Sequence, residues 1–375
     1  MFRRLRKISR NLLIVLNVIA SLLFLAGCYA YLFPPDKYWF IGLLAIGALY
    51  LLLIQLMFLG MWLFIKPRMC FIGILTLALA WKPIQHLFQF RLPAKFEMSK
   101  VPGQFRVMNW NVEHFEIGKQ KNGGVEKQMM LQLIRKYQPD IAFFQEMVGS
   151  ETNPGAINYI PFFRDTLGFA DYHFTYNNKL DYDDDHHFGI ILFSRFPILN
   201  KKEISYNPND YNSTFQYADI LVGNDTIRLF NLHLQSLKLD KANRHYLQQP
   251  GITGEENIRN SKSIIAKLKR GFERRARQSE RIRQAIEASP YPVIVCGDFN
   301  DVPNSYAYHT IGKSLNNAFA AKGSGIGRTY AGISPTLRID HVFAGNQFHI
   351  RQYTRIKKEL SDHFPVVADL EIKKQ

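Results

Sequence analysis

Two long apolar runs near the N-terminus limit what this chain can fold into. Asn11–Pro35 contains 25 residues and Tyr38–Ile65 contains 28, and neither run carries a formally charged side chain. A helix needs about 20 residues to cross the ~30 Å hydrocarbon core of a bilayer, so each run is long enough to span a membrane. We therefore expect at least two transmembrane helices in the N-terminal part of the chain.

A third apolar run decides on which side of the membrane the rest of the chain lies. Met69–Trp81 is shorter than the first two runs and is followed by Lys82 and Pro83. It spans if the helix continues to Phe90 with Lys82 reaching the interface, and otherwise it forms a re-entrant or interfacial segment. Three crossings place the C-terminal part opposite the N-terminus, and two crossings place both on one side.

Flanking cations predict the orientation, because cytoplasmic loops are enriched in Lys and Arg. Lys66 and Arg68 lie between the second and third runs, whereas the far end of the first run has only the pair Asp36 and Lys37. Five further cations precede the first run: Arg3, Arg4, Arg6, Lys7 and Arg10. We expect an integral membrane protein with a cytoplasmic N-terminus. With three crossings its C-terminal domain lies outside the cytoplasm, in the periplasm if the chain is bacterial.

The sequence Leu25–Cys28 allows a second interpretation of the first run. Leu-Ala-Gly-Cys after a basic start and an apolar core resembles a bacterial lipoprotein cleavage and lipidation site. The alternative is a patch of small residues inside a transmembrane helix, and the apolar continuation Tyr29–Phe33 favours it.

The net positive charge is distributed unevenly along the chain. Residues 1–100 contain 12 Lys/Arg against 2 Asp/Glu, and the remaining 275 residues contain 35 against 29, so most of the net +16 lies in the apolar part. Bulk charge therefore does not establish nucleic-acid binding. We predict a membrane region at 1–90, a linker at 91–103 that contains Pro93 and Pro102, and a soluble domain at 104–375.

The soluble part alternates between strands and helices. Helical periodicity predicts helices at Val125–Tyr137 and Glu255–Ala288. The second has a periodic, mainly apolar face that includes Ile258, Ile265 and Phe272, and it carries ten Lys/Arg and five Glu. That basic surface is either a solvated outer face or a surface for acidic lipid headgroups or a polyphosphate. Short apolar runs predict eight strands, which suggests two packed sheets flanked by helices: Phe105–Val112, Ile141–Gln145, Ile190–Phe193, Ile220–Val222, Ile227–Leu234, Val293–Cys296, Ile339–Phe343 and Val366–Leu370.

Polar side chains that can perform chemistry fall repeatedly at the ends of these strands, where a buried segment can present them at a cleft. They occur within seven short motifs, in this order: Asn109-Trp110-Asn111-Val112, Gln145-Glu146, Phe188–Pro197, Asn231-Leu232-His233-Leu234, Gly297-Asp298-Phe299-Asn300-Asp301, Arg338-Ile339-Asp340-His341 and Ser361-Asp362-His363-Phe364-Pro365. Each motif alone is weak, but seven in order are specific.

Over about residues 104–371 this series resembles the endonuclease/exonuclease/phosphatase superfamily. That superfamily includes DNase I-like nucleases, exonuclease III-like repair enzymes, sphingomyelinases and inositol-phosphate phosphatases. The resemblance implies a four-layered α/β sandwich and Mg²⁺-dependent hydrolysis of a phosphoester, with Mn²⁺ as a possible substitute. Such hydrolysis needs a cation on the phosphoryl oxygens, an aligned water and help for the leaving oxygen.

The resemblance also implies roles for individual residues. Mg²⁺ prefers oxygen ligands and keeps several waters, so a few side chains suffice. Glu146 is expected as the principal metal ligand, with Asn111 and Asp362 beside it and Glu113 as an additional contact.

The catalytic residues implied by the resemblance are five. His363, oriented by Asp340, would contact the scissile phosphate and help to activate water, as a carboxylate-held imidazole commonly does. Asp298 would position or deprotonate the attacking water, and Asn300 would hold water or phosphate. His233 would stabilise the transition state or protonate the leaving oxygen. Which group is the general base stays open.

Three functions are compatible with these residues: a membrane-anchored phosphodiesterase or phosphatase, an extracytoplasmic nuclease for DNA or RNA, and a non-catalytic scaffold. Retention of every motif residue disfavours the scaffold. The expected partners are the membrane and a phosphoester (lipid, inositol phosphate or nucleic acid), and the sequence indicates no obligate protein partner. Tyr206–Tyr217 is too polar for a convincing lipid-inserting hairpin, and the acidic and imidazole cluster within Asp181–His187 indicates a solvated loop or a second cation site.

Overall fold

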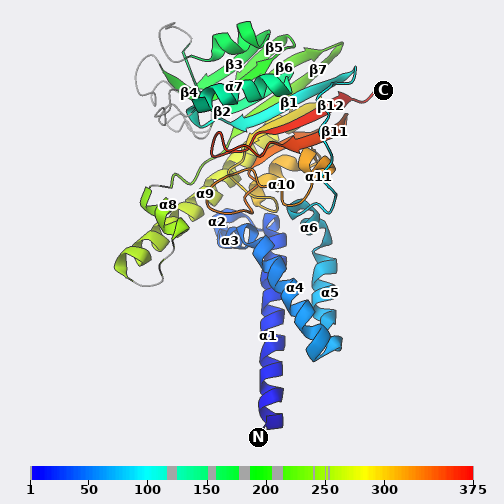
Figure 1. Cartoon of the computed structure of the whole chain (residues 1–375), viewed down its shortest axis with the longest axis vertical. Coiled ribbons are helices and arrows are strands. Elements are labelled where there is room, and N and C mark those ends of the chain that lie inside the picture. The colour runs from blue at the N-terminus through cyan, green and yellow to red at the C-terminus, as the bar shows by residue number, and fades with distance from the viewer. Residues whose placement is uncertain are drawn as a thin grey trace.

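The computed structural model describes residues 2–115, 125–150, 158–176, 186–204, 214–239, 241–249, 251 and 254–374. Asp181–Asp185 of the acidic cluster and residues 206–213 of the aromatic segment lie outside these ranges. The N-terminus and the β-sheets lie at opposite ends of the molecule (Figure 1).

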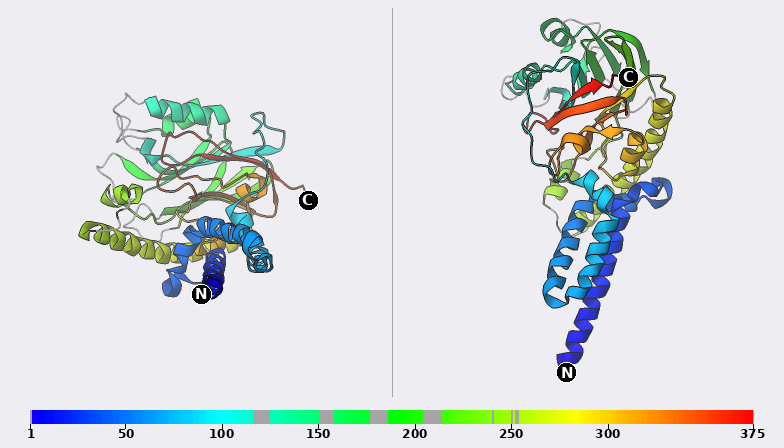
Figure 2. Two further views of the ribbon diagram at one scale, coloured as in Figure 1. Left: turned by 60° about the horizontal axis from the view of Figure 1, so that its bottom comes forward. Right: turned by 90° about the vertical axis from the view of Figure 1, so that its right-hand side faces the viewer.

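The N-terminal part forms a small group of helices in which α1 runs toward the sheets, α4 runs away from them, and α5 with α6 leads back to them (Figures 1 and 2). Two helices are long and apolar enough to cross a membrane, at Ile8–Cys28 and Ala48–Ile65, and a third span is possible if the pair Pro67–Leu79 and Trp81–Leu87, bent by 66°, is one span. The helices are α1 (Phe2–Cys28), α2 (Pro35–Tyr38), α3 (Ile41–Ile46), α4 (Ala48–Ile65), α5 (Cys70–Leu79) and α6 (Trp81–Leu87), with short 3₁₀ turns at Ala30–Leu32 and Pro67–Met69.

Polar side chains join α1 to α4 inside this group of helices. Gln55 accepts hydrogen bonds from Asn17 at 3.4 Å and from Ser21 at 3.2 Å, and the Trp62 indole donates to Asn17 at 3.0 Å. Hydrogen bonds between buried polar side chains hold apolar helices together where the hydrophobic effect between them is weak.

The soluble part is built on two six-stranded mixed sheets. Their orders are β11-β12-β1-β2-β4-β3 and β5-β6-β7-β8-β10-β9, with β1 parallel to β2 and β7 parallel to β8. The first sheet contains β1 (Gln104–Asn111), β2 (Ile141–Gly149), β3 (Asp171–Tyr176), β4 (His187–Ser194), β11 (Phe348–Arg355) and β12 (Val366–Ile372). The second contains β5 (Ile198–Glu203), β6 (Thr214–Val222), β7 (Asp225–His233), β8 (Val293–Asp298), β9 (Asn316–Asn317) and β10 (Asp340–Ala344).

Alternation along the strands builds the layers, because successive side chains point to opposite faces. On β1, Val107 enters the core between the two sheets, whereas Met108 and Trp110 pack on the other side with α7. The outer face of the second sheet packs on α9 and α10. The helices of this part are α7 (Val125–Tyr137), α8 (Lys241–Gln248), α9 (Glu255–Glu287), α10 (Tyr306–Gly312) and α11 (Ala318–Lys322), with a π-helical turn at Phe162–Thr166.

The predicted four-layered sandwich is therefore confirmed, and all eight predicted strands and both predicted helices form. One detail of α9 differs from the prediction: Ile258 and Ile265 of the expected apolar face are 52% and 46% exposed. The N-terminal half of α9 extends past the edge of the sheets together with α8, so this half has no core to pack against (Figure 1).

Candidate active site

The strand ends converge because of the sheet topology. β1 ends at Asn111, β2 carries Glu146 near its end, β7 ends at His233 and β8 ends at Asp298. Parallel pairing of β1 with β2 and of β7 with β8 brings these carboxyl ends to one edge of the sandwich. The two remaining groups enter on antiparallel strands.

Asp340 and His363 reach the same edge from the starts of their strands. β10 is antiparallel to β8, and its first residue Asp340 pairs with Asp298. His363 lies three residues before β12, whose first residue Val366 pairs with Asn109 of β1. The structure thus brings together side chains from six segments that are far apart in the sequence.

The Asn111 carboxamide links two carboxylates at the centre of the site. Its Nδ2 atom lies 3.2 Å from Glu146 Oε1 and 3.2 Å from Asp298 Oδ2. Behind it, Gln145 donates to Asn109 at 2.9 Å and to Asn231 at 2.8 Å, which ties the two sheets together through buried amides. This bonding fixes the orientation of the strand ends that carry the site.

A β-bulge aims Glu146 into the site. The register of β2 against β4 shifts between Phe144 and Met147, and Glu146 has φ +51°. A positive φ is unfavourable for a residue with a side chain, and such conformations concentrate at functional sites. Side chains alternate between the two faces of a regular strand. The extra residue of the bulge interrupts this alternation in β2, so that Glu146 points into the site.

Burial raises the pKa of Glu146 to about 7, and the charge of Asp362 contributes further, against a lowering by the hydrogen bond from Asn111. The pKa of Asp298 is also raised, first by burial, while the charge of His363 lowers it. Carboxylates that lie close together in a buried site repel one another, so the arrangement is unfavourable unless a cation or protons offset the charge.

His363 is held by Asp340. Its Nδ1 atom lies 2.9 Å from Asp340 Oδ2, and its Nε2 atom lies 3.7 Å from Asp298 Oδ2. Burial lowers the pKa of His363, but the charges of Asp340 and Asp298 outweigh burial and raise it well above its usual value. Asp340 and Asp298 thus favour the protonated imidazole, which can donate from Nε2.

His233 lies close to both central carboxylates. Its Nε2 atom lies 3.8 Å from Glu146 Oε1 and 3.7 Å from Asp298 Oδ2. The side chain is almost fully buried, at 2% exposure. Asp298 is thus flanked by two imidazoles, at the same distance from each.

Gly297 permits this approach of β7 and β8. A Cβ atom at Gly297 would lie 2.1 Å from the Leu232 carbonyl oxygen, so a larger residue would push apart the strands that carry His233 and Asp298. This contact gives a physical reason for glycine before aspartate in the Gly297-Asp298 motif.

The remaining predicted residues surround this centre. Asn300 donates from its backbone to Asp298 at 2.8 Å and from its side chain to the Leu234 carbonyl at 3.0 Å. Glu113 accepts from the backbone N–H of Asp362 at 3.1 Å, and Asp362 Oδ1 lies 3.9 Å from His363 Nε2. All nine residues predicted for the site lie at this edge of the sandwich.

The oxygen-rich donor set fits a hard divalent cation, which carboxylates and amide oxygens bind preferentially. Within the described residues, ligand atoms of Asp298, Asp340 and His363 lie within 4.8 Å of one another and could hold a metal. This buried group differs from the set Asn111, Glu146 and Asp362 expected from the sequence. His363 Nδ1 in this group is already hydrogen-bonded to Asp340.

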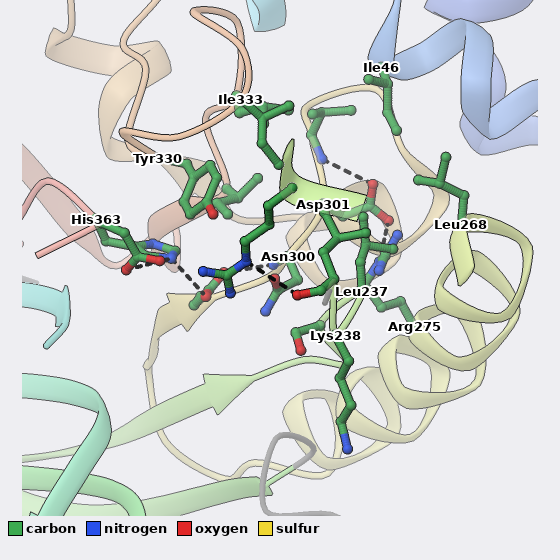
Figure 3. A pocket seen from close by; sticks show the side chains of 18 of the residues that line it. Ile46, Leu237, Lys238, Leu268, Arg275, Asn300, Asp301, Tyr330, Ile333 and His363 are labelled. Atoms are coloured by element: carbon green, nitrogen blue, oxygen red, sulfur yellow. Dashed lines mark hydrogen bonds and ion pairs between the residues drawn. The ribbon is translucent and has the colours of Figure 1, made fainter. Parts of the chain in front are cut away.

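A cavity of about 480 Å³ opens beside this centre (Figure 3). Lys238, Arg244 and Arg275 contribute cations to its lining, and the sequence did not single out any of them as part of the site. Arg275 was counted among the cations of a solvated helix face, yet its side chain is 1% exposed and its Nε atom donates to Asp301 at 3.0 Å. The available signal was its place between Phe272 and Ser279 on the buried stripe of α9.

A four-layered α/β sandwich with this arrangement at its strand ends defines a DNase I-like protein. Residues 108–363, about two-thirds of the chain, match the Endonuclease/Exonuclease/phosphatase family. The chain belongs to this family, whose fold is that of a hydrolase. Residues 10–87 match a second family, described only as a domain of unknown function.

The chain is similar to several solved structures. An endonuclease/exonuclease/phosphatase family protein from Bacteroides thetaiotaomicron is 17% identical, with a TM-score of 0.50, over 73% of this chain and 100% of that one. An endonuclease/exonuclease/phosphatase from Beutenbergia cavernae is 18% identical, with a TM-score of 0.49, over 72% of each chain. The human Nocturnin catalytic domain is 18% identical, with a TM-score of 0.49, over 72% of this chain and 94% of that one. No curated protein matches the chain.

Proposed function

We propose that this chain hydrolyses a phosphoester in a Mg²⁺-dependent reaction, and that apolar helices anchor its catalytic domain to a membrane. The observation that carries the proposal is the position of Asp298, whose Oδ2 atom lies 3.7 Å from Nε2 of both His233 and His363. A carboxylate close to two imidazoles brings a proton acceptor and two proton donors to one phosphate.

The residues divide the proton transfers. Asp298 accepts the proton of the attacking water, and Asn300 holds that water or a phosphoryl oxygen. His363, oriented by Asp340, donates a hydrogen bond to a phosphoryl oxygen, on which negative charge accumulates during the reaction. His233 gives its proton to the leaving oxygen as the bond to phosphorus breaks.

Glu146, Asn111 and Asp362 would hold Mg²⁺. Glu113 would support Asp362, because its carboxylate accepts a hydrogen bond from the backbone N–H of Asp362. When bound, the cation supplies charge neutralisation on the phosphoryl oxygens. Asn111 is hydrogen-bonded to Glu146 and Asp298, which helps to position these carboxylates.

Membrane anchoring rests on the two apolar helices α1 and α4 and on the bent pair α5 and α6. If the pair crosses as one span, the chain crosses three times. Lys66 and Arg68 then lie on the same side as the basic N-terminus, which is the cytoplasmic side by the distribution of cations. The catalytic domain would lie outside the cytoplasm.

The test is hydrolysis of bis(p-nitrophenyl) phosphate by the full chain in detergent, with Mg²⁺ and after chelation. Asp298→Ala should lower kcat by about 10²–10⁴-fold, the usual range for loss of an acid–base group. Asp225→Ala is the matched control, because Asp225 is exposed at the opposite end of β7 from His233. Equal activity in Asp298→Ala and the wild type, or full activity after chelation, would refute the assignment.

A further inference from the structure

The cavity at the active site is polar at one end and apolar at the other. Glu146, Asp298 and His363 line the catalytic end, and aliphatic side chains line a wall away from it: Ile46, Leu237, Leu268, Ile333 and Leu337. Figure 3 shows Ile46 and Leu268 on the side of the cavity opposite His363. A substrate that fills this cavity must therefore combine a phosphate with an apolar group.

Ile46 belongs to the membrane region and not to the sandwich. It is the last residue of α3, and the candidate span α4 begins two residues later at Ala48. The apolar wall thus starts where the chain enters the hydrocarbon region. An acyl chain leaving a bilayer at this point would meet Ile46 before it reaches the catalytic residues.

Packing holds the wall and the catalytic loops as one body. Ile41 and Ala45 of α3 lie in one buried cluster with Val302 and Ile339, which follow Asn300 and precede Asp340. Tyr50 of α4 is hydrogen-bonded to Ser334 at 3.0 Å, which fixes the loop that carries Ile333 to the start of the span. If α4 crosses a bilayer, the cavity therefore lies near the membrane surface.

Cations stand at the same opening. Lys238 and Arg244 line the same cavity, and both side chains are exposed. Arginine and lysine near a bilayer surface attract anionic headgroups. Nucleobases stack on aromatic side chains. Among the described residues that line the cavity, Tyr330 is the one Phe, Tyr or Trp, which disfavours a nucleic-acid substrate.

We propose that the substrate is a membrane lipid phosphoester, bound with its phosphate at Asp298 and His363 and its apolar chain along Ile46, Leu268 and Ile333. This inference rests on the proposed hydrolysis. Water adds to phosphorus, the bond from phosphorus to the leaving oxygen breaks, Asp298 takes the proton of the water and His233 supplies one to the leaving oxygen.

The experiment compares lipids that share a headgroup and differ in chain length. The full chain is placed in phosphatidylcholine nanodiscs that carry dioleoyl phosphatidylglycerol, a diester, or dioleoyl phosphatidic acid, a monoester. The soluble dibutanoyl forms of both lipids, bis(p-nitrophenyl) phosphate and a single-stranded oligonucleotide serve as comparison substrates. The measured quantity is the ratio of the long-chain rate to the short-chain rate for one headgroup.

The wild type should hydrolyse one dioleoyl lipid at least about tenfold faster than its dibutanoyl form. Leu268→Ser and Ile46→Ser should each lower this ratio by about tenfold, as the loss of two or three buried methylene groups implies. Ile265→Ser is the matched control on α9, since Ile265 is 46% exposed and lies outside the cavity lining. It should leave the ratio unchanged. Because the ratio compares two substrates of one preparation, partial misfolding does not change it.

The outcomes separate the two proposals. Hydrolysis of bis(p-nitrophenyl) phosphate without preference for either dioleoyl lipid would overturn the lipid assignment and leave phosphoester hydrolysis intact. Faster cleavage of the oligonucleotide would do the same in favour of a nuclease. An equal loss in Ile265→Ser and Leu268→Ser would remove the apolar wall from the explanation. Hydrolysis of none of these substrates with Mg²⁺ would refute the proposed function itself.

Discussion

At the scale of single residues, Arg275 joins the longest helix of the soluble part to the catalytic loop. Its guanidinium donates to Asp301 at 3.0 Å and to the Gln235 carbonyl at 3.0 Å, and both charged side chains are nearly inaccessible to water. Asp301 directly follows Asn300, so this pair sets the position of a predicted catalytic residue.

Removing one member of such a pair leaves an uncompensated buried charge. We predict that Arg275→Ala destabilises the protein by about 3–5 kcal/mol, the usual cost of breaking a buried ion pair. Arg277→Ala, an exposed cation on the same helix, should change the stability by less than about 0.5 kcal/mol. Chemical unfolding of both variants in detergent measures the difference. Similar stabilities for the two variants would show that the pair contributes little.

The sequence located the polar centre of the site, because each residue stands in a short motif at the end of an apolar strand. It did not locate the cavity around that centre. Ile46 and Leu268 are ordinary aliphatic residues of helices, and only tertiary packing places them near Asp298. For Arg275 the sequence offered only its place between Phe272 and Ser279, and the structure was needed to show that this face of the helix is buried.

At the scale of helices and strands, Gly27 explains part of the small-residue patch near the end of α1. A Cβ atom there would lie 2.5 Å from the Leu44 carbonyl oxygen, so α1 can approach α3 closely only with glycine at this position. Cys28 beside it is fully buried. The interpretation as a packing patch inside a helix therefore has a physical basis, independent of any lipidation.

Gly27→Ala should accordingly lower the stability of the protein in detergent by about 1–3 kcal/mol, because the added methyl group must displace backbone. Gly60 on α4 is the matched control, since a Cβ atom there meets nothing within 4 Å. Gly60→Ala should be neutral or stabilising by up to about 1 kcal/mol. Thermal unfolding of the two variants decides, and equal melting temperatures would contradict close packing of α1 on α3.

One contact between the N-terminal helices and the soluble domain is sensitive to acid. The ring of His309 on α10 stacks on Tyr31, which follows α1, with 3.8 Å between centroids and an interplanar angle of 18°. Burial, followed by the charge of His86, lowers the pKa of His309 to about 3 from its usual 6.5. Between about pH 6.5 and pH 3, His309 therefore binds a proton more readily in the unfolded protein than in the folded protein.

The direction of the change in stability with pH follows from this difference in pKa. The unfolded state binds more protons below pH 6.5, so this residue makes stability fall as the pH falls from about 6.5 toward 3. His309→Gln should lose less stability between pH 7.5 and pH 4.5 than the wild type, by about 1–2 kcal/mol. His349→Gln, at an exposed position, serves as the control. Unfolding curves at the two pH values provide the measurement, and an unchanged difference in His309→Gln would refute the prediction.

Four strands were not predicted, and they share a cause. β3, β5, β9 and β11 lie at or near the edges of the sheets, where one side of the strand faces solvent. β5 is exposed along most of its length and carries Lys201 and Lys202, and β9 has only two residues. Charged edge strands lack the apolar runs by which inner strands are recognised. The inner strands, which carry the site, were all predicted.

At the scale of the whole molecule, the path of the chain relates the N-terminus to the active site. α1, α4 and α5 lie side by side, with the N-terminus at the end of the molecule away from the sheets (Figures 1 and 2). The turn between α4 and α5, which contains Arg68, also lies away from the sheets. If these helices cross a bilayer, the turn and the catalytic domain lie on opposite sides of it.

Cysteine labelling tests this arrangement in the membrane. The natural cysteines Cys28, Cys70 and Cys296 are all buried, at 0%, 6% and 0% exposure, so a single introduced thiol at an exposed position dominates labelling. In bacterial spheroplasts, a membrane-impermeant maleimide should label Asp225→Cys, in the catalytic domain, if the proposed orientation with three crossings is correct. Arg68→Cys should react only after detergent is added. Labelling of Arg68→Cys alone before detergent would reverse the orientation. Labelling of both variants or of neither would mean that α5 and α6 do not return the chain across the bilayer.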